Sequence, residues 1–229
     1  MAVAADLMRP IRSFVLRQGR ITTAQRAALD TLWHDYVLAP THTPLDFDSL
    51  FGRRATRILE IGFGMGDTLA DMAKAHPGQD YLGIEVHRPG VGNLLKLLAA
   101  DKIGNVRVVC ADAVDVLAQH IPDNSLDAVY LFFPDPWPKR RHHKRRLVQT
   151  SFVSAIACKL KPGGFFHLAT DWEDYAGHML RVLDAAPEFA NTAGQGHYAQ
   201  RPDYRPLTKF ERRGRRLGYA VWDLIFTKS

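Results

Sequence analysis

A single carboxylate, Asp135, lies in the stretch "FFPDPWPKRRHHKRR" (residues 132–146), between two prolines and just before six Lys or Arg and two His. A proline fixes its own φ and disfavours helix at the preceding residue, so Pro134 and Pro136 restrict the backbone around Asp135. A carboxylate held in this way can orient a ligand or stabilise positive charge that develops beside it. The basic run is typical of a phosphate-binding surface, and Trp137 adds a flat ring on which a base could stack.

A glycine-rich turn supplies a second set of chemically suggestive residues. The stretch "LEIGFGMGD" (59–67) contains Glu60 followed by Gly62, Gly64 and Gly66. Glycines between a strand and a helix allow a tight turn and a close approach of a ligand to the backbone. A dinucleotide motif would need glycine at position 67, where Asp67 stands, so an NAD-dependent oxidoreductase is disfavoured. Glu60 would repel a pyrophosphate and instead suits a cationic ligand such as S-adenosylmethionine.

Two more acids follow later strands of the same pattern. Glu85 ends a predicted strand, where a carboxylate can accept hydrogen bonds from ribose hydroxyls. Asp112 follows the next predicted strand and could accept from an adenine amino group while the backbone of Ala113 meets the ring. Asp112 alone could equally be a helix N-cap. The combination of glycine turn, Glu85 and Asp112 predicts an adenosine-containing ligand, because open α/β sheets bind ligands at the carboxyl ends of their strands.

Alternating strand and helix patterns predict the elements that position these residues. Short apolar runs predict strands at 57–63, 80–86, 105–111, 126–134 and 165–171, and amphipathic stretches predict helices at 65–76, 90–103, 113–121, 147–160 and 172–186. "KPGG" (161–164) predicts a turn, and 219–228 alternates with the period of a strand. Parallel strands need crossovers, so the pattern predicts an α/β, Rossmann-like, doubly wound sheet that is mostly parallel. An N-terminal basic arm with one helix (22–37) is expected over residues 1–50, before one domain over 51–229.

Composition narrows the class of protein further. The 229 residues are 46% hydrophobic and carry a net charge of +6, and half of the 30 lysines and arginines fall in three windows, 9–20, 139–146 and 209–216. The rest of the chain is acidic overall, so the basic windows predict a nucleic-acid partner. No apolar run approaches the length of a membrane span, and two widely spaced cysteines predict free thiols in a reducing cytoplasm. No metal site is expected.

Several stretches together resemble the tRNA (guanine-N7)-methyltransferases. These are "EIGFGMGD", "GIEVH", "ADA", "YLFFPDPWPKRRHHKRR", "ATDWEDYA" and "TKFERRG", and with "RSFVLRQGRITTAQ" near the start they span nearly the whole chain. The resemblance implies a class I methyltransferase fold with an antiparallel C-terminal strand. It also implies that S-adenosylmethionine donates a methyl group to a variable-loop guanosine of tRNA. No membrane is expected, and the sequence itself requires no protein partner, although some members of the family work with a partner subunit.

The resemblance also assigns roles by position. It implies that Glu60, Glu85, Asp112 and Asp135 line the donor and catalytic site. Substrate contacts are implied for Lys139, Asp171, Thr208, Lys209, Phe210 and Glu211, and RNA contacts for Arg141, His142, His143, Lys144, Arg145 and Arg146. From its residue type and position alone, Asp171 could equally be a helix N-cap.

The chemistry of guanine N7 suggests what Asp135 would do. N7 carries an in-plane lone pair and no proton at neutral pH, so it can attack a methyl donor without a general base. Asp135 is therefore expected to orient the base and stabilise its developing positive charge. Two alternatives remain. An exocyclic-amine methyltransferase is suggested by the Asp-Pro-aromatic end of the fourth strand, and a non-catalytic RNA-binding protein would keep only the basic windows.

Overall fold

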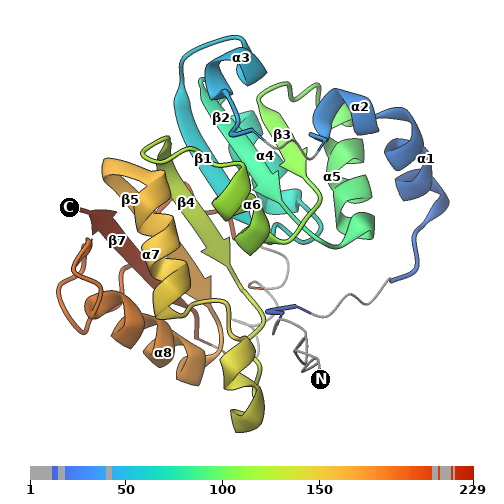
Figure 1. Ribbon diagram of the computed structural model, residues 1–229. Coiled ribbons are helices and arrows are strands. Elements are labelled where there is room, and N and C mark those ends of the chain that lie inside the picture. The colour runs from blue at the N-terminus through green and yellow to red at the C-terminus, as the bar shows by residue number, and fades with distance from the viewer. Residues whose placement is uncertain (1–11, 15–18, 40–42, 208–210, 212–217, 219) are drawn as a thin grey trace, which may run out of the picture.

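The computed structural model describes residues 12–14, 19–39, 43–207, 211, 218 and 220–229. Within these residues, seven strands form one sheet in the order β3-β2-β1-β4-β5-β7-β6 (Figure 1). The strands are β1 (Thr56–Ile61), β2 (Gln79–Ile84), β3 (Val106–Val109), β4 (Leu126–Phe132), β5 (Leu160–Thr170), β6 (Phe189–Asn191) and β7 (Trp222–Lys228). β1 to β5 are parallel, and β7 runs antiparallel to β5 and β6. The predicted mostly parallel, Rossmann-like sheet with an antiparallel C-terminal strand is confirmed.

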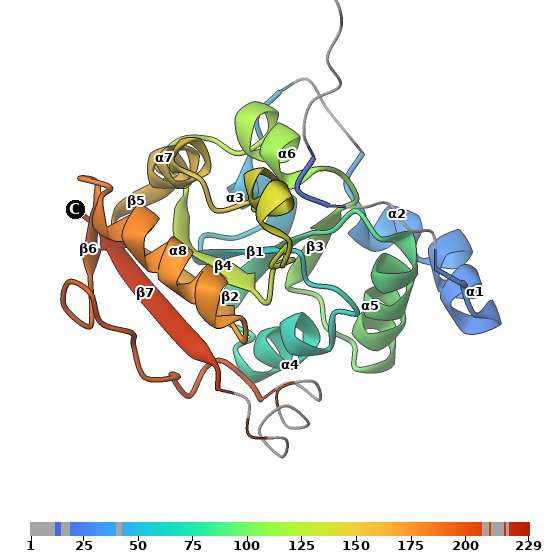
Figure 2. The same cartoon turned by 90° about the horizontal axis from the view of Figure 1, so that it is seen from below.

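Helices cover both faces of the sheet because successive strand residues point to opposite sides. On β4, Val129 and Leu131 join a core with α3, α6, α7 and α8, whereas Ala128, Tyr130 and Phe132 face α1, α4 and α5. Figure 2 shows α6 and α7 on one side of the sheet and α4 and α5 on the other. The helices are α3 (Phe47–Phe51), α4 (Asp67–Ala75), α5 (Arg88–Ala100), α6 (Ala113–Gln119), α7 (Thr150–Lys159) and α8 (Glu173–Asp184).

The N-terminal region packs onto this framework. The single helix expected over 22–37 is two helices, α1 (Thr23–Thr31) and α2 (Trp33–Tyr36), separated at Leu32. The Thr31 hydroxyl donates to the Ala27 carbonyl at 2.8 Å, a local side-chain bond that competes with a continuing helix. Phe47 of α3 is buried in the main core. The division of the chain near residue 50 stays a prediction.

Three local features differ from the sequence-based expectation. The predicted turn 161–164 lies inside β5, because Gly163 adopts a φ of +77° within a ladder that shifts register between Leu126 and Ala128. β6 has three residues, too few to show alternation in the sequence. The basic run forms a short 3₁₀ helix, η1 (Arg140–Arg145), which projects from the lower edge of the molecule in Figure 1. In the part of the chain that the structure describes, no helix is long and apolar enough to cross a membrane.

Candidate active site at the carboxyl edge of the sheet

The carboxyl ends of β1 to β4 surround a cavity of about 420 Å³. Its lining brings together five of the residues selected from the sequence: Gly62, Glu85, Asp112, Ala113 and Asp135. Asp112 also caps α6, since its Oδ1 accepts from the Val114 amide at 3.1 Å, which confirms the N-cap interpretation. Its contact with an adenine amino group stays a prediction. Ser13 and Phe14 complete the wall, although the sequence offered no signal that the N-terminal arm reaches this edge.

A second cavity of about 460 Å³ adjoins the first. Glu60, Gly64 and Gly66 line it from the glycine turn, and Pro206 and Leu207 line it from the far end of the chain. The two cavities share Gly62, Phe132 and Phe133 as lining residues. The aromatic pair at the end of β4 therefore stands where the two spaces meet.

Glu60 lines the second cavity from the end of β1 and is itself buried. The residue is 3% exposed, and its Oε2 has no hydrogen-bond partner among the described residues. Burial, and then the nearby charge of Glu85, raise the pKa of Glu60 to about 8. A buried carboxyl group is costly when unpaired, and a cationic ligand group beside it would relieve that cost.

Glu85 joins the glycine turn to the end of β2. Its Oε2 accepts from the Gly64 amide at 2.8 Å, and its Oε1 accepts from the amides of Val86 and His87 at 2.7 and 2.9 Å. Since a carboxylate offers about four acceptor positions, these three bonds leave room for about one further donor. Glu85 thus shapes the turn as well as facing the cavity.

The three glycines of the turn all have positive φ: +73° at Gly62, +58° at Gly64 and +78° at Gly66. A fourth glycine, missed from the sequence, supports them. A Cβ atom added to Gly90 of α5 would lie 2.0 Å from the Gly64 carbonyl oxygen, so α5 can approach the turn only through a glycine. The pair "PG" at the start of a helix (89–90) was the signal available for it.

Asp135 lies at the mouth of the first cavity in a constrained loop. Phe133 and Trp137, two residues before and after it, both have positive φ, at +52° and +47°. Residues other than glycine rarely adopt this backbone conformation, and it persists only where the surrounding structure holds it. The Phe133 amide donates to the Ala169 carbonyl of β5 at 2.7 Å. Partial burial raises the pKa of Asp135, and the positive charge of Arg145 opposes that rise.

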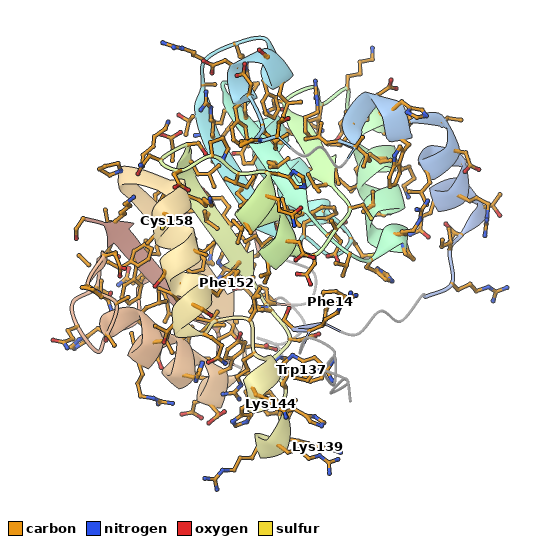
Figure 3. All side chains as sticks on the ribbon, in the orientation of Figure 1. Phe14, Trp137, Lys139, Lys144, Phe152 and Cys158 are labelled. Carbon is orange, nitrogen blue, oxygen red and sulfur yellow. The ribbon has the colours of Figure 1, made fainter. Side chains whose placement is uncertain are left out.

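Trp137 and Arg145 connect this loop to the N-terminal arm. Figure 3 shows Trp137 below Phe14 of that arm. The Trp137 indole donates to the Ser13 carbonyl at 3.0 Å, and Arg145 donates to the carbonyls of Arg12 and Phe14 at 3.2 and 3.3 Å. The Arg145 guanidinium lies 4.2 Å from the centre of the Trp137 ring. One face of Trp137 is therefore covered by Arg145, which limits its expected use as a stacking surface for a base.

The remaining basic residues divide into exposed and buried members. Lys139, Arg140, Arg141 and Lys144 are exposed or nearly so, and Lys139 lies at the outer end of the projecting segment in Figure 3. His142 and His143 are half-buried. Arg146 is 3% exposed, donates to the Pro136 carbonyl at 2.9 Å and pairs with Asp174. The implied RNA contact is thus replaced at Arg146 by a structural role in holding the loop.

Two implied substrate residues lie apart from the cavity walls. Asp171 is half-buried between β5 and α8 and lines neither cavity; it is not the N-cap of α8, which is Trp172. Glu211 is buried and accepts hydrogen bonds from Arg205 at 2.7 and 3.1 Å. Residues Thr208, Lys209 and Phe210 lie outside the described residues.

Comparisons with known proteins agree with this geometry. The family model described as a putative methyltransferase matches residues 54–224. The tRNA (guanine-N(7)-)-methyltransferases of Hydrogenovibrio crunogenus and Alkalilimnicola ehrlichii are 59% and 61% identical, each over 99% of this chain and 96% of the relative. The crystal structure of the 16S rRNA methyltransferase KamB shares the fold, with a TM-score of 0.59 and 16% identity over 85% of this chain and 98% of that one. The chain belongs to the tRNA (guanine-N(7)-)-methyltransferase family.

Proposed function

We propose that this protein transfers a methyl group from S-adenosylmethionine to N7 of a guanosine in the variable loop of tRNA. The observation that carries the proposal is the pair of adjoining cavities at the carboxyl edge of the sheet, with a buried unpartnered acid in one and Asp135 at the mouth of the other. The exposed basic residues of the segment that follows Asp135 supply a surface for an anionic backbone. The membership of the chain in the tRNA (guanine-N(7)-)-methyltransferase family supports the same activity.

The described residues fit the donor. Glu60 lines the second cavity as a buried acid, which suits the cationic methionine end, whereas Glu85, Asp112 and Ala113 line the first cavity, which suits the adenosine. When bound, S-adenosylmethionine supplies an electrophilic methyl group on a positively charged sulfur. The glycine turn brings the backbone close to both cavities without side chains in the way.

Asp135 then acts on the base. Its carboxylate accepts from the guanine N1–H and amino group, which orients N7 toward the donor, and it stabilises the positive charge that enters the base during transfer. No proton needs to leave N7. Because the reacting edge must reach a cavity of the protein, the base is expected to leave its stack, as is common for enzymes that act on bases.

The exposed cluster on η1 is expected to hold the RNA backbone. Replacing Arg141 and Lys144 together with glutamine should weaken tRNA binding and reduce the slope of log K against log salt by about 0.7–0.9 for each phosphate that is no longer neutralised. Fluorescence anisotropy with labelled tRNA over a series of salt concentrations measures this. S-adenosylhomocysteine binding should stay unchanged.

A matched pair at the opposite edge of the sheet serves as the control for this cluster. Arg54 and Lys102 are also exposed but lie near the amino ends of the strands. Replacing both with glutamine removes the same charge and should leave most of the salt slope intact. An equal reduction of the slope in both double variants would show that tRNA responds to net charge alone.

The raised pKa of Glu60 predicts that donor binding releases a proton. With a pKa of about 8 in the free protein, Glu60 is mostly protonated at neutral pH. A cation beside its carboxyl group favours the carboxylate, so donor affinity should rise as the pH approaches about 8 from below. Calorimetry in buffers of different ionisation enthalpy should detect the released proton.

Glu60→Gln is the control for this proton release. In the variant, any proton released on binding comes from groups other than Glu60. The difference in the number of protons released by the two proteins therefore gives the contribution of Glu60. In the free protein the folded state holds more protons than the unfolded state between the ordinary pKa of 4.5 and about 8, so stability falls as pH rises through that window. Glu60→Gln should remove this fall, and identical proton release by both proteins would contradict the assignment.

The activity itself is tested with labelled S-adenosylmethionine and unmodified tRNA. Mapping of the product should place 7-methylguanosine in the variable loop, and a tRNA whose variable-loop guanosine is replaced by adenosine should accept no label. Label in N6-methyladenine would favour an exocyclic-amine methyltransferase instead. Binding of tRNA with no methyl transfer would leave only an RNA-binding role and overturn the proposal.

A further inference from the structure

Arg205, which belongs to none of the sequence motifs, lies in a buried polar network with Glu211 and Asp223. The side chain is fully buried and donates to two carboxylates at once. Its Nη1 and Nη2 lie 2.7 and 3.1 Å from the two oxygens of Glu211, and its Nε and Nη2 lie 2.7 and 3.0 Å from those of Asp223 on β7. The planar guanidinium thus links Glu211 to β7 through charge-assisted hydrogen bonds.

The network continues across the sheet to β5. His167 of β5 lies with its Nε2 2.8 Å from Asp223 Oδ1, and its Nδ1 lies 3.0 Å from the Tyr204 hydroxyl. Burial lowers the pKa of His167, so the ring is neutral at physiological pH. A neutral ring with its proton on Nε2 donates to Asp223 and accepts from Tyr204, which satisfies both nitrogens.

The position of Arg205 relates the network to the two cavities. Its guanidinium lies 5.8 and 5.7 Å from the ring centres of Phe132 and Phe133, the two aromatic residues that both cavities share. The next two residues in the chain, Pro206 and Leu207, line the second cavity. Arg205 therefore contacts the aromatic wall of the second cavity and directly precedes the residues that line another part of it.

The energetics of buried ion pairs favour a role in geometry. Removing charged groups from water is costly, and buried ionic networks often add little net stability over a well-packed apolar core. What such a network does provide is one arrangement in which every donor and acceptor is satisfied. Here that arrangement holds the Arg205 guanidinium against the rings of Phe132 and Phe133, immediately before the cavity-lining Pro206 and Leu207.

We infer that Arg205 is a positioning residue for methyl transfer, which sets the methionine-side wall of the donor site through Phe132, Phe133 and Leu207. The inference rests on the proposed function. In this arrangement Glu211, for which the family resemblance implies a substrate contact, acts on the site through Arg205. Arg205 itself lines neither cavity.

Arg205→Lys tests this inference because a lysine keeps the charge but cannot form the same four hydrogen bonds to two carboxylates. We expect S-adenosylhomocysteine, which has the methionine-derived tail, to bind at least about tenfold more weakly, and adenosine, which lacks that tail, to bind within about twofold of the wild type. The kcat should fall while the KM for tRNA changes little. Isothermal calorimetry measures both ligands, with thermal unfolding recorded for each protein.

Arg53→Lys is the matched control. Arg53 is 41% exposed and pairs with the buried Asp80 at 2.9 and 2.5 Å, at the amino ends of the strands, so this variant alters an arginine–carboxylate interaction away from the two donor-site cavities. Its ligand affinities should match those of the wild type. If Arg205→Lys does not fold, Glu211→Gln decides the question, since it keeps the size of the side chain and should give the same selective loss.

Two outcomes would overturn the inference. In a folded variant, unchanged S-adenosylhomocysteine affinity would show that the network does not position the wall. Equal losses for adenosine and S-adenosylhomocysteine would show a general structural effect. Failure of the proposed function looks different, because the wild-type protein itself would then bind no S-adenosylhomocysteine or form no 7-methylguanosine.

Discussion

Asp135→Asn is expected to lower kcat for tRNA methylation by about 10²–10³-fold while the Kd of S-adenosylhomocysteine stays within about threefold of the wild type. Asparagine keeps the shape of the side chain and can still accept one hydrogen bond, but it carries no charge. The loss therefore arises where positive charge develops, in the transition state, and not in the binding of the donor. Single-turnover kinetics with labelled donor, together with calorimetry, separate the two quantities.

The pH profile provides an independent check of the same residue. Burial raises the pKa of Asp135 in the free protein, and the reaction needs its carboxylate, so wild-type kcat/KM should fall as the pH drops through that raised pKa. The Asp135→Asn variant should lack this fall. Asp115→Asn, an exposed acid on α6, is the control and should retain both rate and profile. Turnover of Asp135→Asn within about threefold of the wild type would exclude the assignment.

Gly90→Ala is expected to weaken S-adenosylhomocysteine binding at least about tenfold and to lower the free energy of unfolding by about 1–3 kcal/mol. The added Cβ would lie 2.0 Å from the Gly64 carbonyl oxygen, so either α5 or the glycine turn must move. Alanine is favoured over glycine inside a helix by about 1 kcal/mol, so helix propensity alone would raise the free energy of unfolding. A lower value would therefore report the steric clash. Calorimetry and chemical denaturation measure the two effects.

Gly104→Ala controls for the substitution itself. A Cβ atom added at Gly104 meets no described atom within 4 Å, and its φ is not positive. Ligand affinity and stability should therefore remain close to those of the wild type. If Gly90→Ala binds ligand as tightly as Gly104→Ala, the turn can adjust and the close approach of α5 is not required.

Features that depend on neighbours along the chain were predictable from the sequence. The glycine turn needs positive φ at three nearby positions, and the prolines beside Asp135 act on adjacent residues, so the residue types reveal both. The mostly parallel, doubly wound sheet also followed, because parallel strands and right-handed crossovers leave few arrangements. The capping role of Asp112 was visible as an alternative for the same local reason.

Features that depend on distant contacts were not predictable. Arg146 resembles its exposed basic neighbours in the sequence, and only its contacts with Pro136 and Asp174 reveal that it is buried. Gly90 and Gly64 are separated in the chain by α4 and β2, and the Arg205 network joins three segments across the sheet. Such pairings follow from packing in three dimensions, which periodicity and residue type do not encode.

The position of β7 has a consequence for how the molecule forms during synthesis. β7 is made after β6, yet it lies between β5 and β6 and provides the partner for both. A nascent chain that has emerged only as far as β6 therefore exposes the edge of β5 and lacks both Arg205 and the Asp223 that holds it. Because Asp223 of β7 holds Arg205, the methionine-side wall of the donor site should be completed only after β7 has paired with β5, late in folding.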